Sequence, residues 1–98
     1  MNTLVIGGTR FIGLSLVHEL HKQGHSVSTL NRGKTQARLP EDVSRLYADR
    51  RDPETVKKAL DGTSFDWVFD CTGYQLINVE PLVNLFRGCI DRYVFVST

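Results

Sequence analysis

Short apolar runs alternate along the chain with longer stretches whose apolar positions repeat at helical spacing. The runs are rich in β-branched and aromatic residues and predict strands, and the stretches predict helices. In the first helix the apolar positions lie at i, i+4, i+5 and i+8 from Ile12, and Gly24 is expected to end it in the left-handed conformation. The expected strands are residues 3–6, 26–30, 44–48, 65–71 and 92–97, and the expected helices are 11–23, 53–60 and one that contains 81–87.

The order of these elements predicts the fold class. Strands that alternate with helices at this spacing indicate an α/β fold, a doubly wound parallel sheet with helices on both faces. The right-handed crossover rule gives the strand order 3-2-1-4-5. Asp52 and Pro53 suit the cap and first position of the second helix. The pattern is weakest over 31–42, where we expect a loop or a short helix.

Composition limits the chain to one globular domain. It has 98 residues, of which 41% are hydrophobic. No apolar run approaches the roughly 20 residues of a membrane-spanning helix, and no signal peptide is visible, so we expect no membrane partner and a cytoplasmic protein. Cys71 and Cys89 match no metal or redox spacing and lie in apolar stretches, so both are expected to be buried, reduced thiols.

The net charge of +1 hides a difference between the two halves of the chain. Residues 1–51 carry eight Lys and Arg against four Asp and Glu, and residues 52–98 carry four against seven. A mildly basic first half suits a small anionic ligand. A long nucleic acid would call for a dense basic stripe, so nucleic acid is not expected as a partner.

The histidines and the tryptophan have structural interpretations. His18 and His21 are one helical turn apart, but the sequence offers no Cys or carboxylate that completes a ligand set with them and His25, so no metal is expected. Trp67 lies in an expected strand and is predicted to pack in the core.

The turn between the first strand and the first helix predicts an anion site. Gly7 permits a sharp turn off the strand, and Gly13 lets the helix pack closely on the sheet. The free N–H groups of a helix that starts near Arg10 would then face a pyrophosphate. Because this turn follows a strand and opens a helix, it favours nucleotide binding over a purely structural role. The residues assigned to the site are Gly7, Gly8, Thr9, Arg10, Phe11, Ile12 and Gly13.

The chain resembles the extended short-chain dehydrogenase/reductases in five segments: VIGGTRFIG, GHSVSTLNRG, ADRRDP, FDWVFDCTGY and RYVFVST. It is similar in particular to their NAD-dependent epimerase/dehydratase group, which acts on nucleotide sugars. The resemblance implies a Rossmann fold and an NAD or NADP cofactor. Gly7 and Gly13 match the first and third glycines of the family's Gly-x-x-Gly-x-x-Gly pattern, and Arg10 replaces the second. Arg10 then either displaces the turn outward or contacts a phosphate, with a solvated surface position as the alternative.

The resemblance assigns a role to the residue that ends the second strand. NAD-specific members have an acidic residue there, which binds the ribose 2′-OH, whereas members that use NADP have a basic residue. This chain has Asn31 and Arg32, with no carboxylate between Ser26 and Pro40. We therefore expect a site that takes NADP, or does not discriminate, rather than one strict for NAD. Arg32 could instead be a solvated loop residue.

Two further strand ends resemble cofactor contacts of the family. Asp49 and Arg50 resemble the pair that holds the adenine ring, although Asp49 also fits a plain loop position. Cys71, Thr72 and Gly73 take the place of the small residues beside the adenosine ribose and the central phosphates. Cys71 is expected to pack there and not to react.

The resemblance also indicates which catalytic groups the chain lacks. The family uses a Tyr whose pKa is lowered by a Lys four positions later, with a Ser or Thr hydroxyl at the substrate. Thr98 resembles the residue that supplies this hydroxyl; the alternative is a strand-end hydroxyl bonded to backbone. No Tyr of the chain has Lys at the fourth position, so the chain alone is expected to be inactive. We interpret 1–98 as the incomplete N-terminal NAD(P)-binding domain of a larger enzyme.

Two functions are consistent with this sequence. The first is the cofactor-binding part of an epimerase/dehydratase-like oxidoreductase, which oxidises a nucleotide sugar transiently by hydride transfer to nicotinamide. The alternative is a non-catalytic nucleotide-sensing or RNA-associated protein, because some relatives with the same Gly-Gly-Thr-Arg-Phe turn are plastid proteins described as RNA-binding. A 98-residue whole protein is less favoured, since its last strand would be exposed. A homodimer of the full protein stays open.

Overall fold

The computed structural model describes residues 1–7, 11–31, 39–49, 52–71, 83–86 and 88–96. Within these segments the chain forms five strands and two helices, and residues 83–86 form a further helical turn. The strands are β1 (Asn2–Ile6), β2 (Ser26–Asn31), β3 (Ser44–Tyr47), β4 (Trp67–Asp70) and β5 (Arg92–Phe95), and the helices are α1 (Phe11–Lys22) and α2 (Pro53–Ala59).

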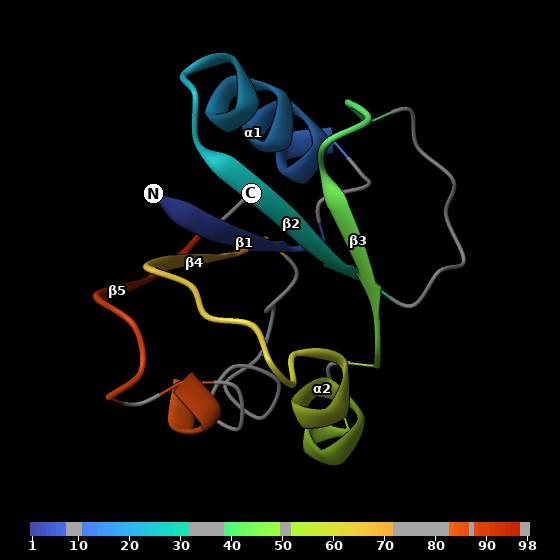
Figure 1. Cartoon of the computed structure of the whole chain (residues 1–98), viewed down its shortest axis with the longest axis vertical. Helices are drawn as coiled ribbons and strands as arrows, with labels where there is room; N and C mark the ends of the chain where they lie inside the picture. Colours follow the sequence, from blue (N-terminus) through green and yellow to red (C-terminus); the bar gives the residue numbers. More distant parts are fainter. Residues whose placement is uncertain (8–10, 32–38, 50–51, 72–82, 87, 97–98) are drawn as a thin grey trace.

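All five strands lie parallel in one sheet, in the predicted order β3-β2-β1-β4-β5 (Figure 1). The last residue of the central strand β1 is aligned with the ends of both neighbouring strands, because Ile6 lies beside Leu30 of β2 and beside Asp70 of β4. Since the strands are parallel and in register, their carboxyl ends meet at one edge of the sheet.

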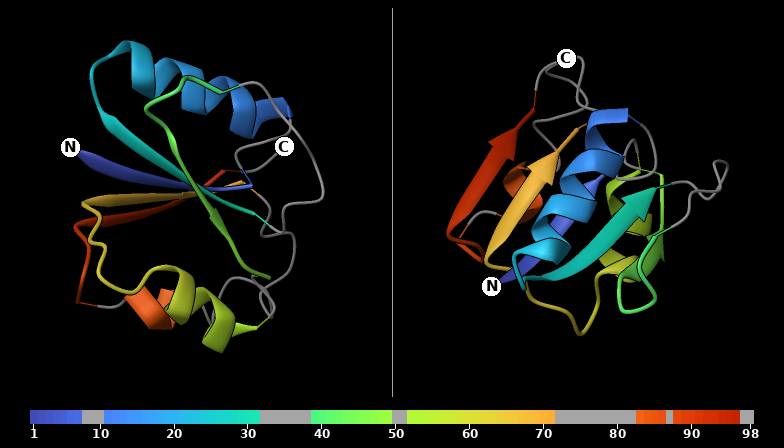
Figure 2. Two further views of the ribbon diagram at one scale, coloured as in Figure 1. Left: turned by 45° about the vertical axis from the view of Figure 1, so that its right-hand side comes forward. Right: turned by 90° about the horizontal axis from the view of Figure 1, so that it is seen from above.

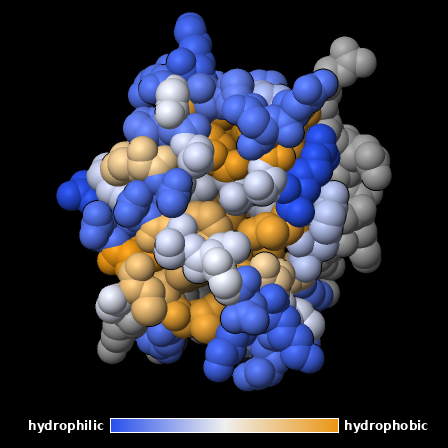
Figure 3. Space-filling view, viewed as in Figure 1, coloured by the Kyte–Doolittle hydropathy of each residue, from blue (hydrophilic) through white to orange (hydrophobic). Residues whose placement is uncertain are grey.

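Helices cover both faces of this sheet, as the alternating pattern predicted. Helix α1 lies on one face, and α2 lies on the other together with the turn 83–86 (Figure 2). The outer surfaces over α1 and α2 are hydrophilic, and apolar residues reach the surface between them (Figure 3). The α2 side holds the buried cluster Leu4, Ile6, Leu30, Val56, Phe65, Val68 and Phe86, and the α1 side holds Val5, Val17, Leu20, Val27, Val43 and Cys71.

These two clusters explain why β1 is apolar at successive positions. Leu4 and Ile6 belong to one cluster and Val5 to the other, because neighbouring side chains of a strand point to opposite faces. A strand that is covered on both faces therefore reads as a continuous apolar run.

The predicted helix signals are confirmed. The Asp52 carboxylate accepts the backbone N–H of Glu54 at 3.2 Å, and Pro53 is the first residue of α2. Gly24 follows α1 with a φ of +89°, and its N–H donates to the His21 carbonyl at 3.0 Å. Such left-handed positions favour glycine.

Some element boundaries differ from the expected ones by one or two residues. Strand β4 begins at Trp67 instead of residue 65. Strand β3 ends at Tyr47 instead of residue 48, and β5 ends at Phe95 instead of residue 97. Backbone hydrogen bonds continue past the ends of β3 and β5. The N–H of Ala48 donates to the Asn31 carbonyl, and the N–H of Val96 donates to the Asp70 carbonyl, both at 2.9 Å. The backbone after β3 and β5 therefore continues toward the carboxyl edge of the sheet.

Two predictions about side chains were wrong. Cys89 is exposed, because it lies in the turn after residues 83–86, where its N–H donates to the Phe86 carbonyl at 2.9 Å. Trp67 is only half-buried and belongs to neither apolar cluster. Its ring lies 6.0 Å from that of Phe69 and 5.0 Å from the Arg92 guanidinium. Helix α1 packs on β1 and β2, and leaves this end of β4 partly open (Figure 2).

The described segments contain neither a membrane-spanning helix nor a metal cluster. None of their helices has the length and apolar character needed to cross a bilayer. In the same segments no three His, Cys, Asp or Glu side chains are grouped to hold a metal ion. His21 has a carboxylate partner that sequence reasoning missed, since its Nε2 lies 2.6 Å from Oδ1 of Asp42.

Candidate functional site

Four of the predicted site residues lie where neighbouring strands end. Gly7 follows β1, Asn31 ends β2, Asp49 lies two residues after β3, and Cys71 follows β4. They come from distant parts of the chain, and the parallel register brings them to one edge of the sheet. Doubly wound sheets bind ligands at this edge.

Gly7 makes the turn at the end of the central strand. Its φ is +81°, a conformation that strains residues with a side chain, and its N–H donates to the Leu30 carbonyl at 2.9 Å. Helix α1 begins four residues later, at Phe11, so its first backbone N–H groups point toward the same edge (Figure 2). The first turn of α1 contains no acidic residue that would repel an anion. Gly13 is buried, as close helix packing requires.

Asn31 and Asp49 lie on adjacent strand ends, and both are half-buried. The Asn31 carbonyl accepts the N–H of Ala48 at 2.9 Å, which ties the segment before Asp49 to β2. The Asp49 carbonyl accepts the N–H of Asp52 at 2.9 Å, so the loop into α2 is also held. These backbone bonds hold Asn31 and Asp49 at the same edge of the sheet. The residue at the end of β2 is neutral, as the sequence showed.

A buried carboxylate at the end of β4 was missed by sequence reasoning. Asp70 is 0% exposed, and the Tyr93 hydroxyl donates to its Oδ2 at 2.6 Å. The signal was present as a charged residue inside the apolar run of β4, but its partner is 23 positions away. Burial, with the Asp70 charge as a second cause, raises the pKa of the Cys71 thiol to about 11. The thiol is therefore protonated at neutral pH, which agrees with packing and not reaction.

The remaining predicted site residues fall into two groups. Phe11 and Ile12 belong to α1 by their backbone. Eight positions lie outside the described residues: Gly8, Thr9, Arg10, Arg32, Arg50, Thr72, Gly73 and Thr98. The basic residues on which a choice between NADP and NAD depends are among them.

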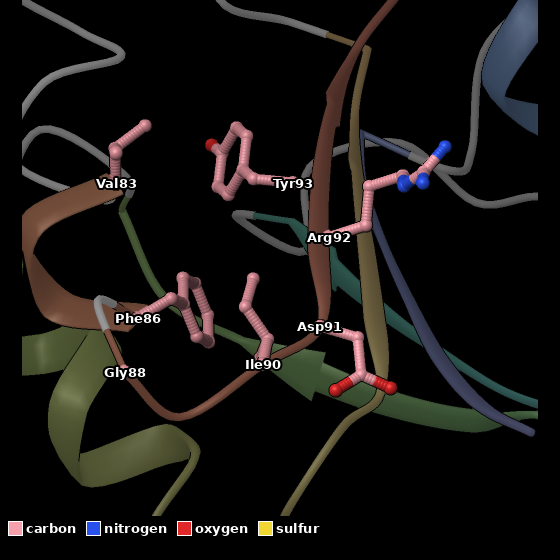
Figure 4. A pocket seen from close by; sticks show the side chains of 7 residues that line it. All are labelled: Val83, Phe86, Gly88, Ile90, Asp91, Arg92 and Tyr93. Carbon is pink, nitrogen blue, oxygen red and sulfur yellow. The ribbon is translucent and has the colours of Figure 1, made fainter.

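A small pocket lies away from this edge, between the turn 83–86 and β5 (Figure 4). Its volume of about 140 Å³ is below the roughly 300 Å³ of typical ligand pockets. The rings of Phe86 and Tyr93 lie 6.2 Å apart and form its apolar side. We therefore assign it to side-chain packing. Its lining residues are Val83, Phe86, Gly88, Ile90, Asp91, Arg92 and Tyr93.

Residues 3–82 match the model of the NAD dependent epimerase/dehydratase family. The chain belongs to this family. It is 34% identical, over 97% of its length, to the "Chloroplast stem-loop binding protein of 41 kDa b" of Arabidopsis thaliana, and 29% identical, over 100%, to the 2'-dehydrokanamycin reductase of Streptomyces kanamyceticus. It spans 28% of each of these relatives.

A solved structure gives the same fold. The UDP-glucose 4-epimerase of Thermus thermophilus, in complex with NAD, superposes with a TM-score of 0.76 and is 26% identical, covering 89% of this chain and 34% of its own. The match and the five-stranded parallel sheet identify the fold of this chain as the Rossmann fold of the family. The turn at Gly7, next to a helix start free of acidic residues, fits the pyrophosphate of a dinucleotide.

Proposed function

We propose that the chain binds NAD or NADP at the carboxyl edge of its sheet and is the cofactor-binding part of an oxidoreductase. The observation that carries this proposal is the turn at Gly7 with the start of α1, at the end of the central strand of a chain that belongs to an NAD-dependent family. When bound, the nicotinamide would accept a hydride from a substrate carbon and return it.

The chain's own residues would bind and orient the adenosine half. The N–H groups at the start of α1 would hold the pyrophosphate, and Gly7 would supply the sharp turn from β1 toward them. The Asp49 carboxylate would accept the exocyclic amine of adenine, and Asn31 would bond the adenosine ribose. Cys71 would pack against the ribose side of the site, where its protonated thiol is inert.

Three finer assignments belong to this proposal. A neutral Asn31 followed by Arg32 supports NADP, or both cofactors, over strict NAD. The substrate would be a nucleotide sugar, with Thr98 supplying a hydroxyl to its oxygen. The absence of a Tyr-x-x-x-Lys pair from the sequence supports an inactive chain. Catalysis would then require further residues from a longer parent protein.

A second candidate function has one observation in its favour. The plant relative at 34% identity is named as a stem-loop binding protein, so an RNA-associated role is the alternative. A protein that binds RNA through phosphate contacts loses affinity steeply as salt rises. Saturable, salt-dependent binding of a stem-loop RNA without any dinucleotide binding would favour this alternative.

Calorimetric titration with NADP and with NAD tests the proposal. We expect both to bind, with NADP the tighter, and Arg32→Asp to weaken NADP more than NAD. Arg10→Gly, which restores the family glycine, reports whether the Arg10 side chain contacts a phosphate. Lys22→Asp is the control for Arg32→Asp, because it makes the same change of charge at the last residue of α1. We expect it to leave the affinities for NADP and NAD unchanged. Absence of binding by either cofactor would contradict the proposal.

A further inference from the structure

Tyr47 is an exposed aromatic residue at the carboxyl end of β3. Its side chain is 57% exposed, one of the few large apolar side chains on the described surface. It pairs in register with Asn31, the last residue of β2. Paired residues of parallel strands present their side chains to the same face, so Tyr47 extends beside Asn31 at the ligand edge.

The face on which Tyr47 lies follows from its neighbour. Leu46 packs against the cluster on the α2 side, and successive residues of a strand alternate between faces. Tyr47 therefore points to the α1 side of the sheet, the side of the helix that starts at the Gly7 turn. The N–H of Ala48, the next residue, donates to the Asn31 carbonyl, which fixes the register of Tyr47 at this position.

Three residues thus meet at the ends of β2 and β3: Asn31, Tyr47 and Asp49. Under the proposed function, Asn31 faces the ribose and Asp49 faces the adenine amine, so a purine ring would extend along this strand end. Neither of those residues carries an aromatic ring that could stack on the base. The exposed Tyr47 side chain carries such a ring, and every purine has a π-face that can stack on it.

We propose that Tyr47 forms one wall of the adenine subsite and stacks on the base of the bound dinucleotide. The inference rests on the proposed function and adds a residue that the Gly turn and the strand-end pattern did not assign. The ligand class is any adenosine phosphate that reaches this edge. Nicotinamide mononucleotide, which has no adenine, would not contact Tyr47.

Phe95 is a matched control. It is 47% exposed and lies at the carboxyl end of β5, the other edge strand of the described sheet. Its partner in register is Asp70, whose buried carboxylate is bonded by Tyr93, so no adenosine candidate lies beside it. Phe95→Ala removes another exposed aromatic ring from the same end of the sheet without touching the proposed subsite.

The test compares affinities for AMP, NAD and nicotinamide mononucleotide in the wild type, Tyr47→Ala, Tyr47→Phe and Phe95→Ala, with circular dichroism as a check of folding. Loss of one base-stacking contact lowers affinity by about fivefold or more. We expect that loss for AMP and NAD in Tyr47→Ala only, with affinity kept in Tyr47→Phe and unchanged mononucleotide binding throughout.

The inference can fail by itself or together with the proposed function. The role of Tyr47 would be overturned, with the proposed function intact, by equal AMP affinity in the wild type and Tyr47→Ala. It would also be overturned if Phe95→Ala reproduced the loss of affinity, or if nicotinamide mononucleotide lost affinity for Tyr47→Ala as well. A wild type that binds neither NAD nor NADP would overturn the proposed function, and the role of Tyr47 with it. The two failures are distinguished by whether the wild type binds dinucleotide.

Discussion

Two buried threonines on adjacent strands differ in their hydrogen bonding. Thr29 of β2 is 0% exposed, and its Oγ1 has no hydrogen-bond partner among the described residues. Thr3 of β1 is 1% exposed, and its Oγ1 donates to the Ser26 carbonyl at 2.9 Å. Replacement by valine changes each hydroxyl to a methyl group of similar size. The two variants therefore isolate the contribution of one hydrogen bond.

The expected effects have opposite signs. Leaving a buried hydroxyl without a partner costs about 1 to 3 kcal/mol, which Thr29→Val removes, so this variant should be more stable by about 1 kcal/mol or more. Thr3→Val loses a hydrogen bond worth about 0.5 to 1.5 kcal/mol and leaves the Ser26 carbonyl without this donor. The higher strand preference of valine affects both variants alike. We expect Thr29→Val to exceed Thr3→Val in stability by about 2 kcal/mol.

Urea unfolding measured by circular dichroism gives both free energies. At constant m, the midpoint should rise for Thr29→Val and fall for Thr3→Val. In a domain of this size 1 kcal/mol corresponds to a shift in Tm of about 4 to 8 °C, which a thermal scan resolves. If Thr29→Val is destabilised as much as Thr3→Val, the Thr29 hydroxyl has a partner in solution and the reasoning is refuted.

Four further measurements have defined outcomes. A thiol reagent at pH 8 should label Cys89 and spare Cys71 in the folded chain; equal labelling would contradict their assigned exposures. Because the pKa of Cys71 is raised from 9.0 to about 11, the folded state holds this proton more tightly than the unfolded state. The contribution of the protonated Cys71 thiol to stability is complete below pH 9 and is lost as pH rises toward 11. Cys71→Ala should therefore flatten the pH dependence of the free energy of unfolding between these two values. Asp52→Ala should lower stability by about 1 kcal/mol in urea unfolding through loss of the α2 cap, whereas Asp52→Asn should retain most of it. Tyr93→Phe should cost about 1.5 to 3 kcal/mol in the same assay, because it removes the hydroxyl bonded to the buried Asp70; no change would mean that this bond is absent in solution.

The fold was predictable because its signals are local. Apolar runs such as that of β1 mark strands buried on both faces, and Asp52, Pro53 and Gly24 mark helix ends through interactions and conformations within a few residues of each end. The strand order follows from a rule of handedness that requires no side-chain detail. The family match over residues 3–82 agrees with this level of prediction.

The errors concern contacts between distant segments. The exposure of Trp67 depends on which strands α1 covers, and that of Cys89 depends on the turn at the end of residues 83–86. The bond between Tyr93 and Asp70 requires the register of β4 against β5. A pattern along one segment contains no information about such pairings, so these features emerged only from the structure.

Amide chemical shifts during titration with NADPH report whether a nicotinamide dinucleotide binds at the carboxyl edge of the sheet. We expect saturable shifts at Gly7, Asn31, Asp49 and Cys71, and none at the amino edge around Asp66, whose N–H donates to the Asn2 carbonyl at the start of β1. Shifts confined to the amino edge or to the pocket beside β5, or no shifts at saturating cofactor, would contradict binding at the carboxyl edge.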